Sequence, residues 1–154
     1  MAHHSLRRAQ AADTEAVLHI QKEAMLPHVV AQYGAWNELE RQKRFRAEDI
    51  LEHDMIEVDG RVAGCVWVRR SPAHHEVVRL YLLAAFQNQG IGSAVLRSIM
   101  REAESLGLPV RLRVLRANPA KHLYERMGFT VCDATETHYD MQYSRAPEIY
   151  PAKT

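Results

Sequence analysis

The feature that most constrains this chain is a glycine turn, QNQGIG (residues 87–92), between two apolar segments of different period. EVVRLYLL (76–83) before it has the composition of a strand. After it, apolar residues recur at helical spacing up to Gly107, a natural helix stop. These residues are Val95, Leu96, Ile99, Ala103 and Leu106. VRLRVL (110–115) then alternates as a strand does, so the order predicts a parallel crossover.

Antiparallel strands are expected before this crossover. MIEV (55–58) and VAGCVWVRR (62–70) flank Asp59 and Gly60, a pair that tolerates the positive φ angles of a tight hairpin turn. We therefore predict an α/β fold with a mixed, mostly antiparallel sheet of about six to seven strands and helices on both faces. The length of 154 residues favours a single domain over 1–154.

The N-terminal part predicts a strand over 6–9 and a helix that Asp13 caps and Pro27 ends near Met25. A charged helix should follow the irregular region at Tyr33 and Gly34. Leu39 and Phe45 are expected to face inward from it.

The C-terminal part predicts a short helix that starts at Asn118 and Pro119 and stops at Gly128. FTVCD (129–133) and HYDMQYS (138–144) are then expected as the last strands. The segment 145–154, with two prolines, is expected to be a loose tail.

Composition excludes several classes of partner. Twenty basic and nineteen acidic side chains leave a formal charge of +1, so neither nucleic acid nor an anionic membrane surface is expected. The histidines lack metal-ligand spacing, and no metal is expected. Cys65 and Cys132 have no CxxC spacing, and the start shows no signal peptide, so a cytoplasmic location is expected.

A turn that passes from a strand into a helix directs backbone N–H groups outward at the positive end of the helix dipole. Such a turn can bind phosphate, and glycines allow close approach. The P-loop ending GK[ST] is missing, because Ser93 and Ala94 follow the second glycine. A dinucleotide fingerprint from Gly90 would need glycine or alanine where Val95 stands.

The residues that fit are Gln87, Gly90 and Gly92, as QxxGxG, together with the downstream run RANPAKHLYERMGF (116–129). This combination resembles the acetyl-coenzyme A site of the GNAT acyltransferase superfamily. The resemblance is strong over about residues 76 to 143. It implies acetyl-CoA as co-substrate and transfer of an acetyl group to a primary amine. A CoA-binding or sensing module without catalysis, and a different acyl group on the same scaffold, are the alternatives.

By this resemblance, backbone amides of the turn surround the CoA pyrophosphate, and backbone groups of Leu80 and Leu82 pair with the pantetheine arm. Asn118 is either a helix cap, a pantetheine ligand or both; its spacing to Tyr124 is one residue shorter than in many members. The implied cofactor-binding residues are Leu80, Leu82, Gln87, Asn88, Gln89, Gly90, Ile91, Gly92, Ser93, Asn118 and Tyr124.

The resemblance also implies the catalytic residues. Tyr124 would be the general acid that protonates the departing thiolate. Glu76 matches one of two positions where members carry a basic glutamate, and Arg79 matches the other but cannot accept a proton. Glu136 and His138 are lower-ranked substitutes for the base.

The acceptor is expected at His28, Tyr33 and Trp36, in the region that walls the acceptor pocket in the family. Core packing is the other interpretation of these aromatic residues. A small amine, an amino acid, an antibiotic or a protein N-terminus all fit, so the partner is a small-molecule or peptide amine. The oligomeric state, including a homodimer, is left open.

Overall fold

The computed structural model describes residues 3–45 and 47–145, and the rest of the expected tail lies outside this part. It contains a seven-stranded sheet with the strand order β1-β2-β3-β4-β5-β7-β6. Its strands are β1 (Ser5–Arg8), β2 (His53–Val58), β3 (Arg61–Arg70), β4 (His75–Leu82), β5 (Val110–Leu115), β6 (Thr130–Ala134) and β7 (His138–Tyr143). Only β4 and β5 are paired in parallel in this sheet; the other neighbours are antiparallel. The predicted mixed fold is therefore confirmed.

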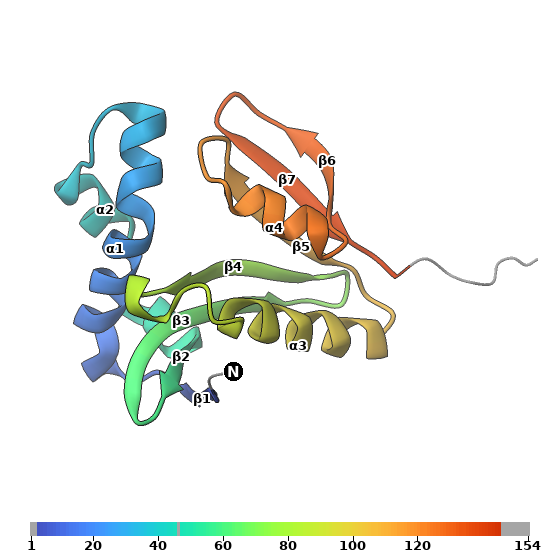
Figure 1. The fold of residues 1–154 in the computed structure, drawn as a ribbon, viewed down its shortest axis with the longest axis horizontal. Coiled ribbons are helices and arrows are strands. Elements are labelled where there is room, and N and C mark those ends of the chain that lie inside the picture. The colour runs from blue at the N-terminus through green and yellow to red at the C-terminus, as the bar shows by residue number, and fades with distance from the viewer. Residues whose placement is uncertain (1–2, 46, 146–154) are drawn as a thin grey trace, which may run out of the picture.

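Four α-helices and three short 3-10 segments complete the described fold. The helices are α1 (Thr14–Tyr33), α2 (Glu38–Arg44), α3 (Ile91–Ser105) and α4 (Ala120–Arg126), and the 3-10 segments are η1 (Ala11–Asp13), η2 (Ala47–Glu52) and η3 (Ala84–Phe86). Figure 1 shows α1 and α2 together at one end of the molecule, and α4 with β6 and β7 at the other. Within the described ranges, no helix combines the length and the apolar content that spanning a membrane requires.

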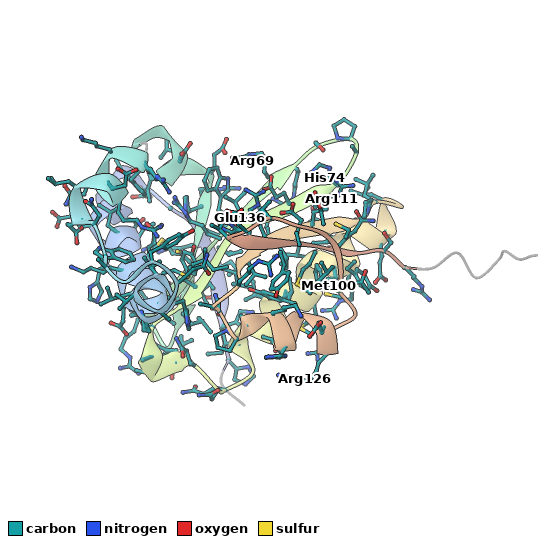
Figure 2. All side chains as sticks on the ribbon, turned by 90° about the horizontal axis from the view of Figure 1, so that it is seen from above. Arg69, His74, Met100, Arg111, Arg126 and Glu136 are labelled. Atoms are coloured by element: carbon teal, nitrogen blue, oxygen red, sulfur yellow. The ribbon has the colours of Figure 1, made fainter. Side chains whose placement is uncertain are left out.

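The sheet has a core on each face, because successive strand residues point to opposite sides. Ile56 and Val66 belong to the larger core, which α3 covers, whereas their neighbours Met55 and Cys65 belong to the smaller core, which includes Val17 and Ile20 of α1. In the view from above, Met100 of α3 and Arg126 of α4 lie on one side, with Arg69 and Arg111 on the other (Figure 2). The prediction of helices on both faces is thus confirmed.

Helix α1 corrects one prediction, because it continues through Pro27 to Tyr33. The proline is on the exposed side of the helix, while Ile20 and Val29, before and after it, are buried. Packing of both ends against the sheet outweighs the backbone hydrogen bond that proline removes. The helix ends instead at Gly34, whose φ of +86° allows its N–H to donate to the Val30 carbonyl oxygen at 2.8 Å.

Three side chains also differ from their predicted roles. Asp13 precedes α1, but its carboxylate accepts from the Gln10 backbone N–H at 2.8 Å instead of capping that helix. Leu39 is 70% exposed, and Phe45, just after α2, packs inside as predicted. Leu106 is 60% exposed because α3 ends one residue earlier, and Leu108 packs against the core in its place.

Two turns form as their residues predict. Asp59 and Gly60 have φ angles of 52° and 77° and join β2 to β3. Gly107 has a φ of +70° just after α3, and its N–H donates to the Glu104 carbonyl oxygen at 3.0 Å.

Candidate active site

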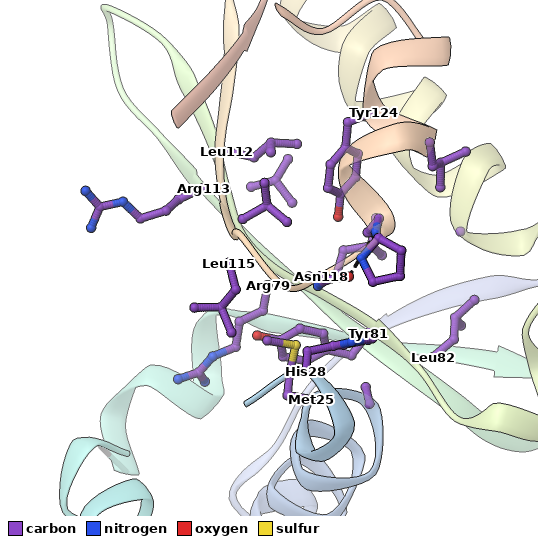
Figure 3. A pocket seen from close by; sticks show the side chains of 18 of the residues that line it. Met25, His28, Arg79, Tyr81, Leu82, Leu112, Arg113, Leu115, Asn118 and Tyr124 are labelled. Carbon is purple, nitrogen blue, oxygen red and sulfur yellow. Dashed lines mark hydrogen bonds between the residues drawn. The ribbon is translucent and has the colours of Figure 1, made fainter. Parts of the chain in front are cut away.

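The candidate site is a cleft of about 990 Å³ where β4 and β5 separate. The two strands pair only through His75–Val110, Glu76–Arg111 and Val77–Leu112. Beyond these pairs, residues of both strands line the cleft. Figure 3 shows the side chains that reach into it.

A β-bulge at Val78 accounts for this separation. On β3, Trp67 and Val68 face Arg79 and Val77, so Val78 has no partner in the ladder. A bulge bends its strand and increases its twist, and β4 therefore diverges from β5 at this point.

The bulge also decides which side chains reach each side of the cleft. Leu80 and Leu82 pack with the core that α3 covers, whereas Tyr81 packs with the α1 core. Glu76 and Arg79 pair with Arg69 and Trp67 across the ladder, on the α1 face with Tyr81. We call the part lined by α1, α2 and these side chains the α1 side, and the part lined by the glycine turn, α3 and α4 the α3 side.

The glycine turn forms one end of the α3 side. Gly90, at φ +82°, is the residue before α3, and Asn88 also has a positive φ of 63°. Among the described residues, no backbone N–H from 88 to 93 donates to another protein group. These groups open toward the cleft at the positive end of a 15-residue helix, which favours an anion.

Two glutamines of the turn make internal hydrogen bonds. Gln87 Nε2 donates to the Leu82 carbonyl oxygen at 2.9 Å and fastens the turn to the end of β4. Gln89 Nε2 donates to the Ala85 carbonyl oxygen at 3.0 Å, and Gln89 does not line the cleft, in contrast to Gln87, Asn88 and Gly90. Ile91, Gly92 and Ser93 line it as well.

Tyr124 extends from α4 into the cleft, with its hydroxyl directed toward Asn118 (Figure 3). Its ring packs on Phe129 with centroids 6.0 Å apart, and the hydroxyl has no hydrogen-bond partner within the described part of the chain. Burial, and to a lesser extent Tyr81, raise the pKa of Tyr124 to about 12. The phenol therefore stays protonated at neutral pH.

Asn118 lines the same part of the cleft. Its Oδ1 accepts from the Ala120 backbone N–H at 2.9 Å, although α4 begins at Ala120, slightly later than predicted. This bond stabilises the start of α4, although the N-cap position itself is Pro119 and has no side-chain cap.

The candidate bases differ in position. Glu76 lines the cleft and forms an ion pair with Arg69 at 3.2 Å. His138 also lines it, Thr137 Oγ1 lies 2.7 Å from its Nδ1, and burial lowers its pKa, with a smaller effect of Arg113 in the same direction. Glu136 is exposed and does not line the cleft.

The predicted acceptor residues are only partly brought together. His28 and Tyr33 line the α1 side, but Trp36 does not. Trp36 Nε1 donates to Glu38 Oε1 at 3.1 Å, and the Arg41 guanidinium lies 4.8 Å from the centre of its ring.

The sequence reasoning missed other residues of the α1 side, namely Met25, Arg41, Tyr81, Arg113 and Leu115. Alternation along β4 could have indicated Tyr81, but no local pattern marks the others. In the described residues, no group of three or more histidine, cysteine or carboxylate side chains is placed to bind a metal ion.

Comparisons with known proteins agree with this arrangement. The model of the acetyltransferase (GNAT) domain family matches residues 50–131, more than half of the 154-residue chain. No curated protein matches the sequence.

Three solved structures illustrate the shared fold. The PaiA N-acetyltransferase from Thermoplasma acidophilum in complex with coenzyme A has a TM-score of 0.76 at 18% identity, over 93% of this chain and 99% of that one. The ribosomal-protein-S18-alanine N-acetyltransferase from Escherichia coli has a TM-score of 0.66 at 18% identity, over 97% of this chain and 100% of that one. Naa50 from Arabidopsis thaliana in complex with the bisubstrate analogue CoA-Ac-MVNAL has a TM-score of 0.64 at 16% identity, over 92% of this chain and 99% of that one.

The mixed sheet, its split between β4 and β5, and the glycine turn before α3 together form the fold of an acyltransferase. The chain belongs to the GNAT acetyltransferase family. It is accordingly an acyltransferase with acetyl-CoA as its co-substrate.

Proposed function

We propose that this protein transfers the acetyl group of acetyl-CoA directly to a primary amine. The observation that carries this proposal is that the α3 side and the α1 side of one cleft have different linings. Asn88 and residues 90–93, whose backbone N–H groups are free, line its α3 side, and His28 and Tyr33 line its α1 side. A donor and an acceptor that enter from these two sides meet in the gap between β4 and β5.

The donor would lie on the α3 side. The N–H groups of the glycine turn bind the pyrophosphate, and the Asn118 side-chain NH₂ binds the pantetheine arm. Free backbone groups of Leu80 and Leu82 pair with the same arm, as an added strand pairs with a sheet edge. Since Gln87 already occupies the Leu82 carbonyl oxygen, its contribution is to hold the turn against β4.

The transfer needs no covalent intermediate on the enzyme. The amine nitrogen attacks the thioester carbon, a C–N bond forms, and the C–S bond breaks as CoA leaves as a thiolate. Tyr124 donates its proton to that sulfur while a proton leaves the attacking nitrogen. The cysteines do not suit a nucleophilic role, because burial raises the pKa of Cys65 to about 12 and Cys132 does not line the cleft.

Glu76 is the proposed acceptor of the nitrogen proton, directly or through water. Its place on the α1 face of β4, beside the cleft, supports this role. The ion pair with Arg69 at 3.2 Å fixes the direction of its carboxylate. His138 lines the cleft and is the second candidate for the base.

A test of the proposed function begins with binding. Acetyl-CoA at 100 times its Kd should stabilise the fold by about 2.7 kcal/mol, a rise of about 5 to 10 °C in melting temperature. An amine panel is then screened for release of free CoA thiol. Tyr124→Phe should slow turnover by about 10² to 10⁴ and preserve binding. Tyr139→Phe is the matched control, because Tyr139 lies outside the cleft.

No rise in melting temperature would contradict the donor site, and full activity in Tyr124→Phe would contradict the acid. Binding without thiol release from any amine would favour the CoA-sensing alternative. The Tyr124 hydroxyl, which has no hydrogen-bond partner among the described residues, and the room for an acceptor on the α1 side favour the enzyme over that alternative.

We propose that the chain acts as one domain of this kind in the cytoplasm. Cys65 and Cys132 are both unpaired, which supports a reducing compartment.

A further inference from the structure

Arg79, on the α1 side of the cleft, has no carboxylate partner among the described residues. Within 4.0 Å of the Arg79 guanidinium, no carboxylate of the described residues is found, although Arg79 lines the cleft. Two other cleft arginines are neutralised: Arg44 pairs with Glu40 at 3.3 Å and Arg113 with Asp140 at 2.9 Å. The remaining carboxylate that lines the cleft, Glu76, is bound by Arg69. The charge of Arg79 is therefore available to a ligand.

Arg79 is also fixed in place. One guanidinium nitrogen lies 3.2 Å from Nε2 of the buried His53, and the guanidinium lies 5.5 Å and 5.7 Å from the ring centres of Trp67 and Phe45. A guanidinium has five N–H donors, and the bond to His53 uses one of them. The others form a rigid fork that matches a carboxylate, with little side-chain entropy left to lose on binding.

A second cation strengthens the positive potential at this point. Arg41 of α2 lines the cleft and has no carboxylate within 4.0 Å in the described ranges. Burial raises the pKa of Tyr81, and Arg79 and Arg41 both oppose that rise. The two cations therefore act on the same place in the cleft, where the Tyr81 hydroxyl lies.

Gln32 of α1 makes two hydrogen bonds beside the cleft, with the residues that precede Asn118 and His138 in the chain. Its Nε2 donates to the Thr137 carbonyl oxygen at 2.7 Å, and its Oε1 accepts from the Ala117 backbone N–H at 3.0 Å. These bonds fasten α1 to the loop before α4 and to the turn between β6 and β7. This connection limits how far α1 and the two loops beside the cleft can separate, which favours a small acceptor over an extended peptide.

We propose that the acceptor is a small amino carboxylate whose carboxylate is bound by Arg79. This inference rests on the proposed function. Arg79 is next in the chain to Leu80, whose backbone is assigned to the donor arm, and both residues line the same cleft, so an acceptor bound by Arg79 lies beside the donor. Met25, Tyr81 and Leu115 supply an otherwise apolar wall for the rest of the acceptor (Figure 3).

The test compares amines that differ only in the carboxylate. L-methionine and L-phenylalanine are each paired with the corresponding amide, and spermidine and a short peptide complete the panel. Thiol release is measured with acetyl-CoA at one pH. The amide loses its amine proton more readily, so the comparison is biased against the proposal. We expect kcat/KM for the amino acid to exceed that of its amide by about 10-fold or more.

Arg79→Gln should lower kcat/KM for the amino acid by about 10- to 100-fold, chiefly through KM, and leave the amide unaffected. Arg79→Lys retains the charge but not the forked guanidinium, so its kcat/KM for the amino acid should lie between those of the unaltered enzyme and Arg79→Gln. Arg111→Gln is the matched control, because Arg111 bonds Gln142 at 2.8 Å and does not line the cleft. The acetyl-CoA shift in melting temperature reports whether each variant folds and binds the donor.

The comparison on the unaltered enzyme is decisive even if Arg79→Gln does not fold. The proposal would be overturned if the amides, spermidine or the peptide were acetylated as fast as the amino acids. It would also be overturned if Arg79→Gln lowered kcat/KM equally for an amino acid and its amide. Acetyl-CoA binding without acetylation of any amino acid would overturn it as well. The proposed function fails separately, when acetyl-CoA does not bind or when no amine releases thiol.

Discussion

Nε2 of His53 lies 3.2 Å from the Arg79 guanidinium, while Nδ1 of the same ring lies 2.8 Å from the Asp49 carbonyl oxygen. A guanidinium only donates and a carbonyl oxygen only accepts, so the ring must carry its proton on Nδ1 and be neutral. Protonation of Nε2 would remove the bond to Arg79. The tautomer of a fully buried histidine thus determines how one cleft arginine is held.

This arrangement predicts how stability depends on pH. Burial lowers the pKa of His53, and Arg79 adds to the effect, so the native state stays neutral below about 6.5, where an unfolded histidine takes up a proton. The unfolded state then binds more protons, and the free energy of unfolding should fall as pH decreases from about 7.5 to 5.5. The loss ends once the folded pKa is passed. Urea denaturation at several pH values measures the slope.

His53→Gln should reduce this slope, because an amide can make both hydrogen bonds without titrating. A smaller slope should remain from His138, whose pKa is also lowered. The exposed His122 gives the control substitution His122→Gln, which should leave the slope as it is. A slope unchanged in His53→Gln would show that the ring is not the titrating group.

Tyr124 predicts the alkaline side of the activity profile. Its pKa of about 12 means that the acid keeps its proton well above the ordinary tyrosine value of about 10. We therefore expect kcat/KM to rise with pH as the acceptor amine loses its proton, and to stay level until about pH 11. Rates with a responsive amine, checked by circular dichroism at each pH, measure this. A decline centred near pH 10 would contradict the role of the buried phenol.

The elements predicted best are those encoded by neighbouring residues. Asp59 and Gly60 form the expected hairpin because positive φ angles are required at both positions, and α3 forms because its apolar residues repeat every turn. The continuation of α1 past Pro27 was missed because it depends on packing of Val29 against the sheet, which no local pattern contains.

The two sides of the candidate site also differ in how far the sequence predicts them. The turn at Gly90 and the position of Tyr124 lie in short motifs on the α3 side, and the sequence suffices to find them. The α1 side is assembled from distant segments: His53 and Arg79 are 26 residues apart, and Gln32 and Thr137 are 105 apart. Sequence spacing cannot predict such contacts, and Trp36, placed in the site by resemblance alone, lies outside the cleft.

The two glycines of the turn should respond differently to alanine. Gly90 has a φ of +82°, and a methyl group added there would meet no other atom within 4 Å, so Gly90→Ala should cost about 1 to 2 kcal/mol from backbone strain alone. Gly92 has no positive φ, and its Cβ would lie 3.5 Å from Leu82 Cδ1, an ordinary contact. Gly92→Ala should keep or slightly raise the melting temperature, because alanine favours a helix.

Gly92→Ala should nevertheless weaken CoA binding, since the added methyl group would lie beside the N–H groups that we propose bind the pyrophosphate. Thermal unfolding and calorimetric titration with CoA separate these effects on stability and on affinity. Equal affinity for CoA in Gly92→Ala and the unaltered protein would argue against close approach of the ligand at this turn.

Gln32 predicts the size limit of the acceptor. Gln32→Ala removes two part-buried hydrogen bonds and should lower the free energy of unfolding by about 1 to 3 kcal/mol. Gln32→Glu can still accept from the Ala117 N–H but cannot donate to the Thr137 carbonyl oxygen. Its free energy of unfolding should therefore lie between those of the unaltered protein and Gln32→Ala. Both variants release α1 from the turn between β6 and β7, and the ratio of kcat/KM for a peptide amine to that for an amino acid should rise. Gln42→Ala, at an exposed position of α2, is the control. If the ratio stayed constant in Gln32→Ala, the connection through Gln32 would be structural only, and the small size of the acceptor would need another cause.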